Sequence, residues 1–139
     1  MSGPIVLGYD GSESAQAALE HTATLAKELE AEVVVVFGYY ISPLGGGDVH
    51  DYKAALEKVG TDAATEAVSR LEAEGIRASS QLVSAKPADA IMDVAKETGA
   101  RLVVVGTVGE GPITGAILGS VVLKLIQRCP VPMLVIPTG

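Results

Sequence analysis

Five short runs rich in Val, Ile and Leu are spaced along the chain, and a helical pattern lies in each interval between them. The runs are residues 5–7, 33–37, 78–83, 102–105 and 133–136. Short apolar runs of this kind are typical of strands that are buried on both faces of a sheet. Strands that alternate with helices of this length imply right-handed crossovers, so the pattern predicts a doubly wound, five-stranded parallel sheet of the α/β class. The pattern does not define the order of the strands.

Four helices are predicted from mostly apolar residues that recur at steps of three and four, which is the period of one helix face. In the first two helices these residues are Ala15, Ala18, Thr22, Leu25 and Leu29, and then Leu56, Val59, Ala63, Ala67 and Leu71. Pro87 and Gly99 are suited to start and end a third helix, and a fourth runs from about Ser120 to Arg128. Residues 39–50 follow no such period, and we interpret them as a surface loop, with a lid or a partner-binding loop as the alternative.

The composition fits one such domain and excludes several functional classes. The 139 residues are enough for a single domain spanning residues 1–139. Aromatic residues make up only 4% of the chain, which argues against an aromatic platform for single-stranded nucleic acid. The formal net charge is −7, and no run of Lys and Arg offsets it. We therefore expect no binding to nucleic acid and none to an anionic membrane surface.

The cellular compartment is suggested by three absences in the sequence. The first residues lack the basic region and the long apolar core of a signal peptide. No stretch approaches the ~18 apolar residues that a membrane-spanning helix needs. Cys129 is the only cysteine, so an intrachain disulfide is excluded. We therefore expect a cytoplasmic protein.

Two segments that follow predicted strands carry unusual residues, and ligands of open α/β sheets bind beyond the carboxyl ends of the strands. One is residues 9–12, Tyr-Asp-Gly-Ser, and the other is residues 106–120, which hold five glycines. Glycines let the backbone bring its N–H groups close to an anion, and a helix that begins at Ser120 would add its own free N–H groups and dipole. The second segment therefore predicts a phosphate-binding loop. The alternative is that its glycines only serve tight turns and close packing, with Ser120 as a plain N-cap.

Three parts of the chain resemble the universal stress protein family. Residues 106–120 contain G-x2-G-x9-G-S, which matches the G-x2-G-x9-G-[S/T] signature of the ATP-binding branch of that family. Residues 5–26, IVLGYDGSESAQAALEHTATLA, look like its first strand, acidic residue and first helix, and residues 129–137, CPVPMLVIP, look like its last strand. The resemblance covers essentially the whole chain in the right order. It implies an adenine nucleotide alpha hydrolase-like fold with the strand order 3-2-1-4-5.

The resemblance also implies a ligand, which is ATP or, as alternatives, AMP or cyclic AMP. The adenine would lie near the ends of the first two strands, and the phosphates would lie in the glycine-rich loop. On matching positions, Asp10 would lie near the ribose or the base, and Val36 would flank the adenine. The phosphates would be held by backbone N–H groups and one hydroxyl group of Gly106, Gly109, Gly119, Ser120 and Val121.

A homodimer formed through the last strand is a further implication of the resemblance. In the implied order, residues 131–136 form an apolar strand at the edge of the sheet. An uncovered apolar edge strand is prone to pair with other chains. Pairing of two copies across a two-fold axis would cover it.

Three residues depart from what members of the family that hold ATP commonly carry. Val108 stands where a basic residue or His is frequent, Glu110 where a basic residue is frequent, and Val122 where Ser or Thr is common. A missing cation and an added anion would each weaken triphosphate binding by about 1 kcal/mol or more. AMP or cyclic AMP would suffer less from Glu110, and a Mg²⁺ ion between Glu110 and the phosphates would turn the repulsion into a bridge.

No catalytic constellation of Ser-His-Asp, Cys-His or paired carboxylates can be assembled from the sequence, and no metal-binding spacing is present. We therefore expect a nucleotide-binding protein of stress response or signalling, with at most very slow nucleotide hydrolysis. The alternative is a dimeric interaction module of the same fold that binds no nucleotide, which Val108, Glu110 and Val122 favour. For Asp10, the alternative to a ligand role is to help cap the helix that begins near Ser12.

Overall fold

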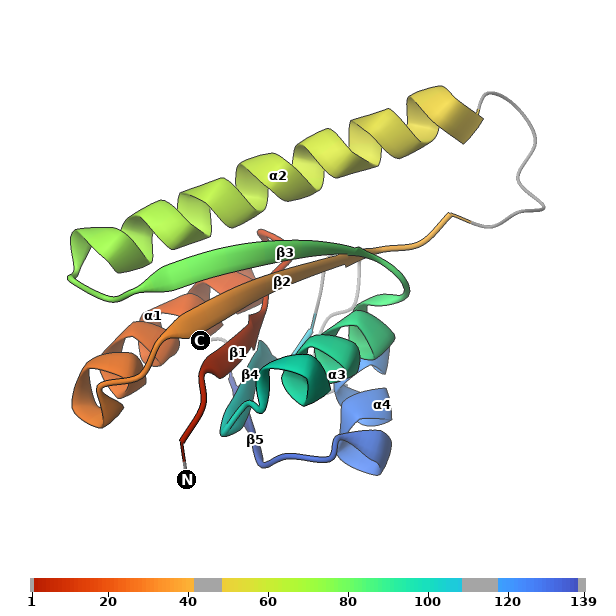
Figure 1. Ribbon diagram of the computed structural model, residues 1–139. Helices are drawn as coiled ribbons and strands as arrows, with labels where there is room; N and C mark the ends of the chain where they lie inside the picture. Colours follow the sequence, from red (N-terminus) through yellow and green to blue (C-terminus); the bar gives the residue numbers. More distant parts are fainter. Residues whose placement is uncertain (1, 42–48, 109–117, 138–139) are drawn as a thin grey trace.

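The computed structural model describes residues 2–41, 49–108 and 118–137 (Figure 1). One sheet of five parallel strands has the order β3-β2-β1-β4-β5. The strands are β1 (Ile5–Gly8), β2 (Val33–Tyr39), β3 (Ala78–Ser84), β4 (Leu102–Gly106) and β5 (Met133–Ile136). The predicted fold class and the strand order implied by the family resemblance are therefore confirmed. Each strand begins at the residue where its apolar run begins.

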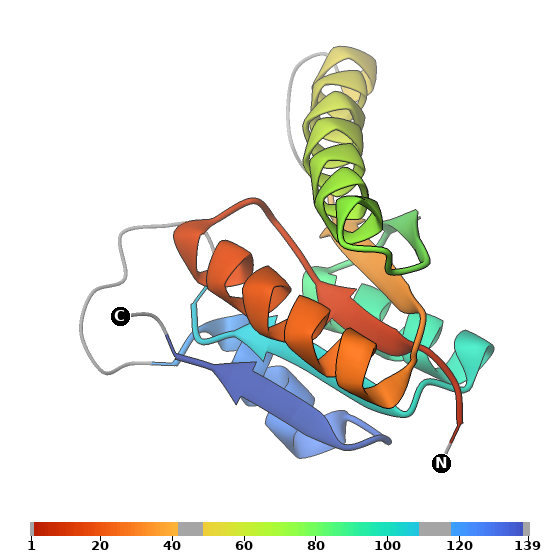
Figure 2. The ribbon, with the colours of Figure 1, turned by 90° about the vertical axis from the view of Figure 1, so that its left-hand side faces the viewer.

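Helices cover both faces of the sheet, two on each (Figures 1 and 2). One face carries α1 (Glu13–Leu29) and α2 (Val49–Ala73), and the other carries α3 (Pro87–Thr98) and α4 (Ser120–Arg128). Alternate residues of each strand feed the two cores because successive side chains of a strand point to opposite faces. In β1, Ile5 and Leu7 pack toward α1 and α2, and Val6 packs toward α3 and α4.

β1 lies in the middle of the sheet and is paired on both sides. Ile5 lies opposite Val33 of β2 on one side and opposite Leu102 of β4 on the other. β2 and β3 therefore lie on one side of β1, and β4 and β5 lie on the other. Where the strand order reverses in this way, between β1 and β4, a cleft opens at the carboxyl ends of the strands. At the sheet edge, Met133 and Leu134 of β5 are only partly buried.

α2 begins earlier than the apolar pattern predicts. The pattern starts at Leu56, whereas the helix starts at Val49. Residues 51–55 are exposed, so they leave no apolar period in the sequence. The predicted irregular stretch of residues 39–50 is therefore shorter, because Tyr39 ends β2 and residues 49 and 50 open α2. Residues 42–48 lie outside the described part of the chain, so a lid or partner-binding loop there stays a prediction.

The side of α2 that packs on the sheet agrees with the predicted face except at Val59. Its buried residues are Gly60, Ala64, Ala67 and Leu71. Phe37 of β2 occupies the space beside Gly60, where an added Cβ would lie 2.6 Å from the ring carbon Cδ1. Val59, predicted to share the packed face, is 56% exposed. Ala63, Ala67 and Leu71 belong to the packed side as predicted, so the prediction fails at Val59, next to Gly60, which has the Phe37 ring beside it.

None of the described helices combines the length and the apolar character that crossing a membrane requires.

Candidate functional site

A cavity of about 430 Å³ lies at the carboxyl edge of the sheet, over the ends of β1, β2 and β4. It is lined by Gly8, Tyr9, Asp10, Ala15, Val36, Phe37, Gly38, Leu56, Val59, Pro87, Ile91, Val105, Gly106, Val108, Gly119, Ser120, Val121 and Val122. The structure thus brings together six predicted site residues, Asp10, Val36, Gly106, Gly119, Ser120 and Val121. Gly109, the seventh, and Glu110 lie outside the described residues.

One end of the cavity is polar because the N-terminus of α4 faces it. Gly119 is the N-cap residue, so Ser120 is the first residue of the helix rather than its cap. Gly119 provides no side-chain hydrogen bond to the first turn, and its own N–H group donates to the carbonyl oxygen of Thr107 at 2.9 Å. The first N–H groups of any helix have no acceptor within the helix. The N–H groups of Ser120 and Val121, together with the Ser120 hydroxyl, therefore make this end suited to an anion.

Ser14, in the first turn of α1, positions the start of the glycine-rich segment. The Val108 N–H group donates to the Ser14 hydroxyl oxygen at 3.2 Å. Gly106 lies so close to the same residue that an added Cβ would be 2.2 Å from Oγ and 2.6 Å from the carbonyl oxygen of Ser14. Ser14 is 3% exposed. Sequence reasoning missed this contact, since a serine in the first turn of a helix gives no signal that a distant loop packs on it.

Asp10 connects the end of β1 to the start of α1. Its Oδ1 atom accepts a hydrogen bond from the Ser12 N–H group at 2.9 Å. Ser12 is the N-cap of α1, and its hydroxyl oxygen accepts from the Ala15 N–H group at 3.2 Å. Asp10 therefore fixes the turn that leads into the cap, and it also lines the cavity.

The other end of the cavity is apolar. Leu56 and Val59 of α2 line it from one face of the sheet, and Pro87 and Ile91 of α3 line it from the other. Gly38 of β2 lies between these walls and permits the close approach of α3, since an added Cβ would be 2.8 Å from Cα of Pro87. Sequence reasoning did not identify any of these residues as part of a site, because their apolar character is also that of core residues.

Tyr9 is buried, and the ionisable groups of Glu66 and Arg70 on α2 act on its phenol. Burial raises the pKa of Tyr9, the nearby Glu66 carboxylate raises this pKa further, and Arg70 opposes the shift. Tyr9 is thus neutral at physiological pH and is no candidate for a general base. Arg70 also lies 3.8 Å from the carboxylate of Glu20 on α1.

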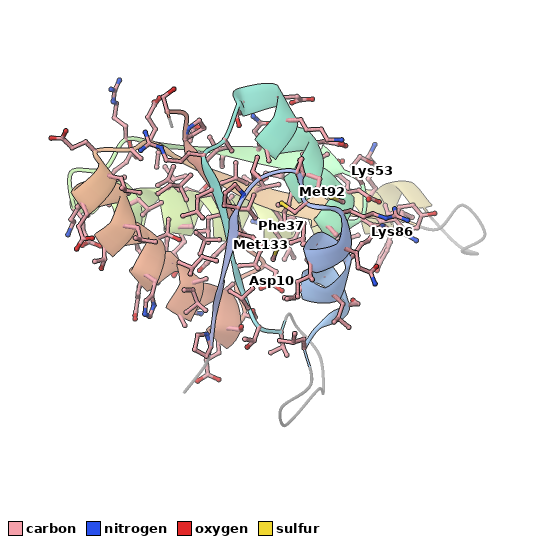
Figure 3. The ribbon with its side chains drawn as sticks, turned by 90° about the horizontal axis from the view of Figure 1, so that it is seen from below. Asp10, Phe37, Lys53, Lys86, Met92 and Met133 are labelled. Carbon is pink, nitrogen blue, oxygen red and sulfur yellow. The ribbon has the colours of Figure 1, made fainter. Side chains whose placement is uncertain are left out.

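Charged side chains are sparse around the cavity. Asp10 is the one Asp, Glu, Lys, Arg or His among the described residues that line it. On the described part of α3 and α4, Lys124 pairs with Asp89 at 3.1 Å, and Lys86 lies 5.2 Å from the ring centre of Tyr40. In Figure 3, Lys86 lies well away from Asp10. Within the described ranges, no group of three or more His, Cys, Asp or Glu side chains is placed to hold a metal ion.

The chain was compared with protein families, with characterised proteins and with solved structures. The family model described as "Universal stress protein family" matches residues 1–137. A universal stress protein of Methanocaldococcus jannaschii is 29% identical over 136 residues, which cover 95% of this chain and 80% of the relative. A solved universal stress protein in complex with cAMP is 27% identical, with a TM-score of 0.77 and full coverage of both chains. A universal stress protein of Archaeoglobus fulgidus in complex with dAMP is 28% identical, with a TM-score of 0.70 and 96% of each chain covered. The match of the family model over nearly the whole sequence shows that this chain belongs to the universal stress protein family.

Proposed function

We propose that this protein binds an adenine nucleotide in the cavity at the carboxyl edge of its sheet. The observation that carries the proposal is the polarity of that cavity, which has at the α4 end helix N–H groups without an acceptor among the described residues, and aliphatic walls at the α2 and α3 end. A nucleotide has the matching polarity, with an anionic phosphate at one end and a flat base at the other. Two similar proteins, each more than a quarter identical to this chain, are known in complex with cAMP and with dAMP.

In the proposed complex each predicted residue has a distinct task. Asp10 lies near the ribose, and Val36 flanks the adenine. The N–H groups of Ser120 and Val121 and the Ser120 hydroxyl bind a phosphate. Gly106 and Gly119 let the backbone lie close to the ligand, and Gly109 keeps its predicted role as a phosphate-binding residue.

The ligand is proposed to be ATP, with AMP and cyclic AMP as the alternatives. Asp10 is the one carboxylate among the described residues of the cavity and does not make a metal site by itself. For ATP, a Mg²⁺ ion between the phosphates and Glu110 is part of the proposal. AMP and cyclic AMP have one phosphate and need fewer cations around it than ATP does. They therefore suit a cavity wall that has the uncharged residues Val108 and Val122.

We further propose a cytoplasmic binding protein of stress response or signalling rather than an enzyme. The ionisable groups of the described cavity wall support this view, because the Asp10 carboxylate is engaged with the Ser12 N–H group and Tyr9 is neutral. A bound nucleotide would then change the stability of the protein or its affinity for a partner. At most, very slow hydrolysis of the nucleotide would accompany binding.

The second candidate function is a dimeric interaction module that binds no nucleotide. It is favoured by the absence of any Lys, Arg or His side chain among the described residues that line the cavity. Such a module would share the fold and the edge strand, and its cavity would have no ligand in the cell.

Isothermal titration calorimetry with ATP, AMP and cyclic AMP, each with and without Mg²⁺, distinguishes the two candidates. We expect saturable binding of at least one nucleotide at a stoichiometry of one per chain. Mass spectrometry of ligand released from freshly purified protein would identify the one that the cell supplies. If none of the three nucleotides binds under either condition, the proposal is wrong and the interaction module stands.

Homodimerisation through β5 is proposed together with nucleotide binding. β5 is an edge strand, and Met133, Leu134 and Val135 are partly exposed in the single chain. Sedimentation velocity at micromolar concentration is expected to give the mass of a dimer. A monomer under these conditions would contradict this part of the proposal without affecting nucleotide binding.

A further inference from the structure

Two aliphatic side chains of α2 form a cavity wall that the sequence motif of the family does not include. Leu56 and Val59 are one helical step of three residues apart, and both line the cavity. Val59 is 56% exposed, although the apolar period of α2 predicts it on the packed face. A half-exposed valine at a cavity mouth presents its methyl groups to whatever enters, because no described side chain of the core covers them.

The opposite wall is built by α3, on the other face of the sheet. Pro87 and Ile91 line it, also one helical turn apart. Pro87 is the first residue of α3 and has no N–H group, so its ring presents an apolar surface where another helix start would offer a donor. Ile91 packs against Gly8, where an added Cβ would lie 2.5 Å from the isoleucine Cδ1. This contact fixes the position of Ile91, which is 3% exposed, at the base of that wall.

The slot suits the base of a nucleotide and does not suit its phosphate. A phosphate needs hydrogen-bond donors or cations, and none of the side chains of Leu56, Val59, Pro87 and Ile91 supplies one. An aromatic base gains from contact with aliphatic groups on both of its faces. Phe37, the aromatic residue of the lining besides Tyr9, has its ring packed beside Gly60 of α2.

We infer that Leu56 and Val59 of α2 cover one face of the bound base, with Pro87 and Ile91 against its other face. The inference rests on the proposed nucleotide binding and adds α2 to the residues that determine affinity for the base. Binding buries the exposed methyl groups of Val59 and thereby ties the N-terminal half of α2 to the occupancy of the site. The contact depends on the base and not on the number of phosphates.

Methyl NMR of the unmodified sequence tests the placement directly. On addition of AMP, ring currents of the adenine shift the methyl resonances of Leu56 and Val59. Ribose 5-phosphate, which has the same sugar and phosphate without the base, leaves them nearly unchanged. The methyl groups of Leu123 and Ile126, exposed on α4 and outside the cavity lining, serve as the internal control. Resonances of Leu56 and Val59 that stay in place at saturating AMP overturn the inference.

Substitution of the wall provides the affinity test. Val59→Ser is expected to weaken AMP binding about fivefold, since it removes methyl groups that the base would bury. Val59→Ile is expected to keep the affinity within about twofold, because it retains the aliphatic surface. Tyr52→Ser is the matched control, since Tyr52 lies on the same half of α2, is 58% exposed and does not line the cavity.

The outcomes separate the inference from the function on which it rests. If Val59→Ser binds AMP as tightly as the unmodified protein does, α2 does not cover the base, and nucleotide binding still stands. If Val59→Ser weakens AMP and ribose 5-phosphate equally, a base-specific contact is also ruled out. If the unmodified protein binds no nucleotide at all, the proposed function fails and the inference fails with it.

Discussion

The N-termini of α3 and α4 both meet the same cavity, yet they offer it opposite chemistry. Neither helix has a side chain that caps its first turn, since Lys86 and Gly119 occupy the N-cap positions without such a bond. The dipole of each helix is positive at its N-terminus, so it does not distinguish the N-terminus of α3 from that of α4. The first helical residue distinguishes the two N-termini, because Pro87 presents a ring without an N–H group, whereas Ser120 presents an N–H group and a hydroxyl.

The strands in front of the two helices reinforce this difference. Gly38 of β2 lets the Pro87 backbone pack against the sheet, and the apolar ring of Pro87 lines the α3 end. Gly106 of β4 instead packs against Ser14, on the opposite face from α4, and leaves the α4 end accessible. The fold alone therefore does not define an anion site. In the proposed complex, one proline and two glycines distinguish the helix N-terminus that would face a phosphate from the one that would not.

The largest effect is expected for Gly106→Ala at the polar end. The new Cβ would lie 2.6 Å from the Ser14 carbonyl oxygen and 2.7 Å from its carbonyl carbon, so the backbone of α1 or β4 must shift. We expect the free energy of unfolding, measured by urea denaturation, to fall by about 3 kcal/mol or more. Nucleotide affinity measured by calorimetry should fall with it. A loss below about 1 kcal/mol would show that this contact is not tight and would weaken the contrast between the two ends.

Ser120→Asp separates ligand affinity from folding at the polar end. A carboxylate at the first residue of α4 repels a phosphate by about 2 kcal/mol, which is about a 30-fold loss of AMP affinity. The same carboxylate is favourable near a helix N-terminus, so the free energy of unfolding should stay equal or rise by about 0.5 kcal/mol.

The matched control for that variant is Ser120→Asn, which has nearly the same shape without the charge. It should retain most of the affinity in the same titration. Equal affinity of the Asp and Asn variants for AMP would place the phosphate away from α4.

Gly38→Ala sharpens the comparison at the apolar end. The added Cβ would lie 2.8 Å from Cα of Pro87 and 2.9 Å from Cβ of Ala90, which pushes α3 away from β2. Thermal and urea denaturation should report a loss of about 1–2 kcal/mol. AMP affinity should fall more than affinity for ribose 5-phosphate, because the change widens the slot for the base. Equal losses for the two ligands would contradict the assignment of the base to this end.

The smallest effect is expected for Ser14→Ala. It removes the acceptor of the Val108 N–H group in a position that is 3% exposed, and it should lower the free energy of unfolding by about 1 kcal/mol. Ser69→Ala, the same change at an exposed position of α2, is the control and should stay within about 0.5 kcal/mol. Matching values for the two variants in urea denaturation would mean that Ser14 does not hold the start of the loop.

The strands and the extents of α1, α3 and α4 could be predicted from the sequence because their buried residues are apolar and recur in runs or at the period of a helix. The apolar runs start where the strands start, and Pro87 and Gly99 delimit α3 as expected. The order of the strands came only from the family resemblance, since a parallel sheet of alternating units leaves no local trace of its order. The first turns of α2 were missed because residues 51–55 are exposed and have no packed face.

From residue chemistry alone the candidate site was predictable where glycine, serine and aspartate mark it, whereas Val36 and Val121 came from the family resemblance. Asp10, Gly106 and Ser120 stand out because they follow strands at the edge where ligands bind, the latter two in a segment dense in glycine, and the structure brings them to one cavity. Val59 and Pro87 could not be recognised, since an aliphatic residue in a helix is normally part of the core. Val59 fits the apolar period of α2 and is nevertheless exposed, and exceptions of this kind are expected at functional positions.

The central place of β1 has a consequence for how the chain is made. Because Ile5 lies opposite both Val33 and Leu102, the first strand to leave the ribosome completes its pairing only after β4 has been synthesised. Contacts between such distant parts of a chain slow folding, and an unpaired apolar strand is exposed to aggregation in the meantime. One edge of β1 therefore stays unpaired until the segment that forms β4 has been synthesised.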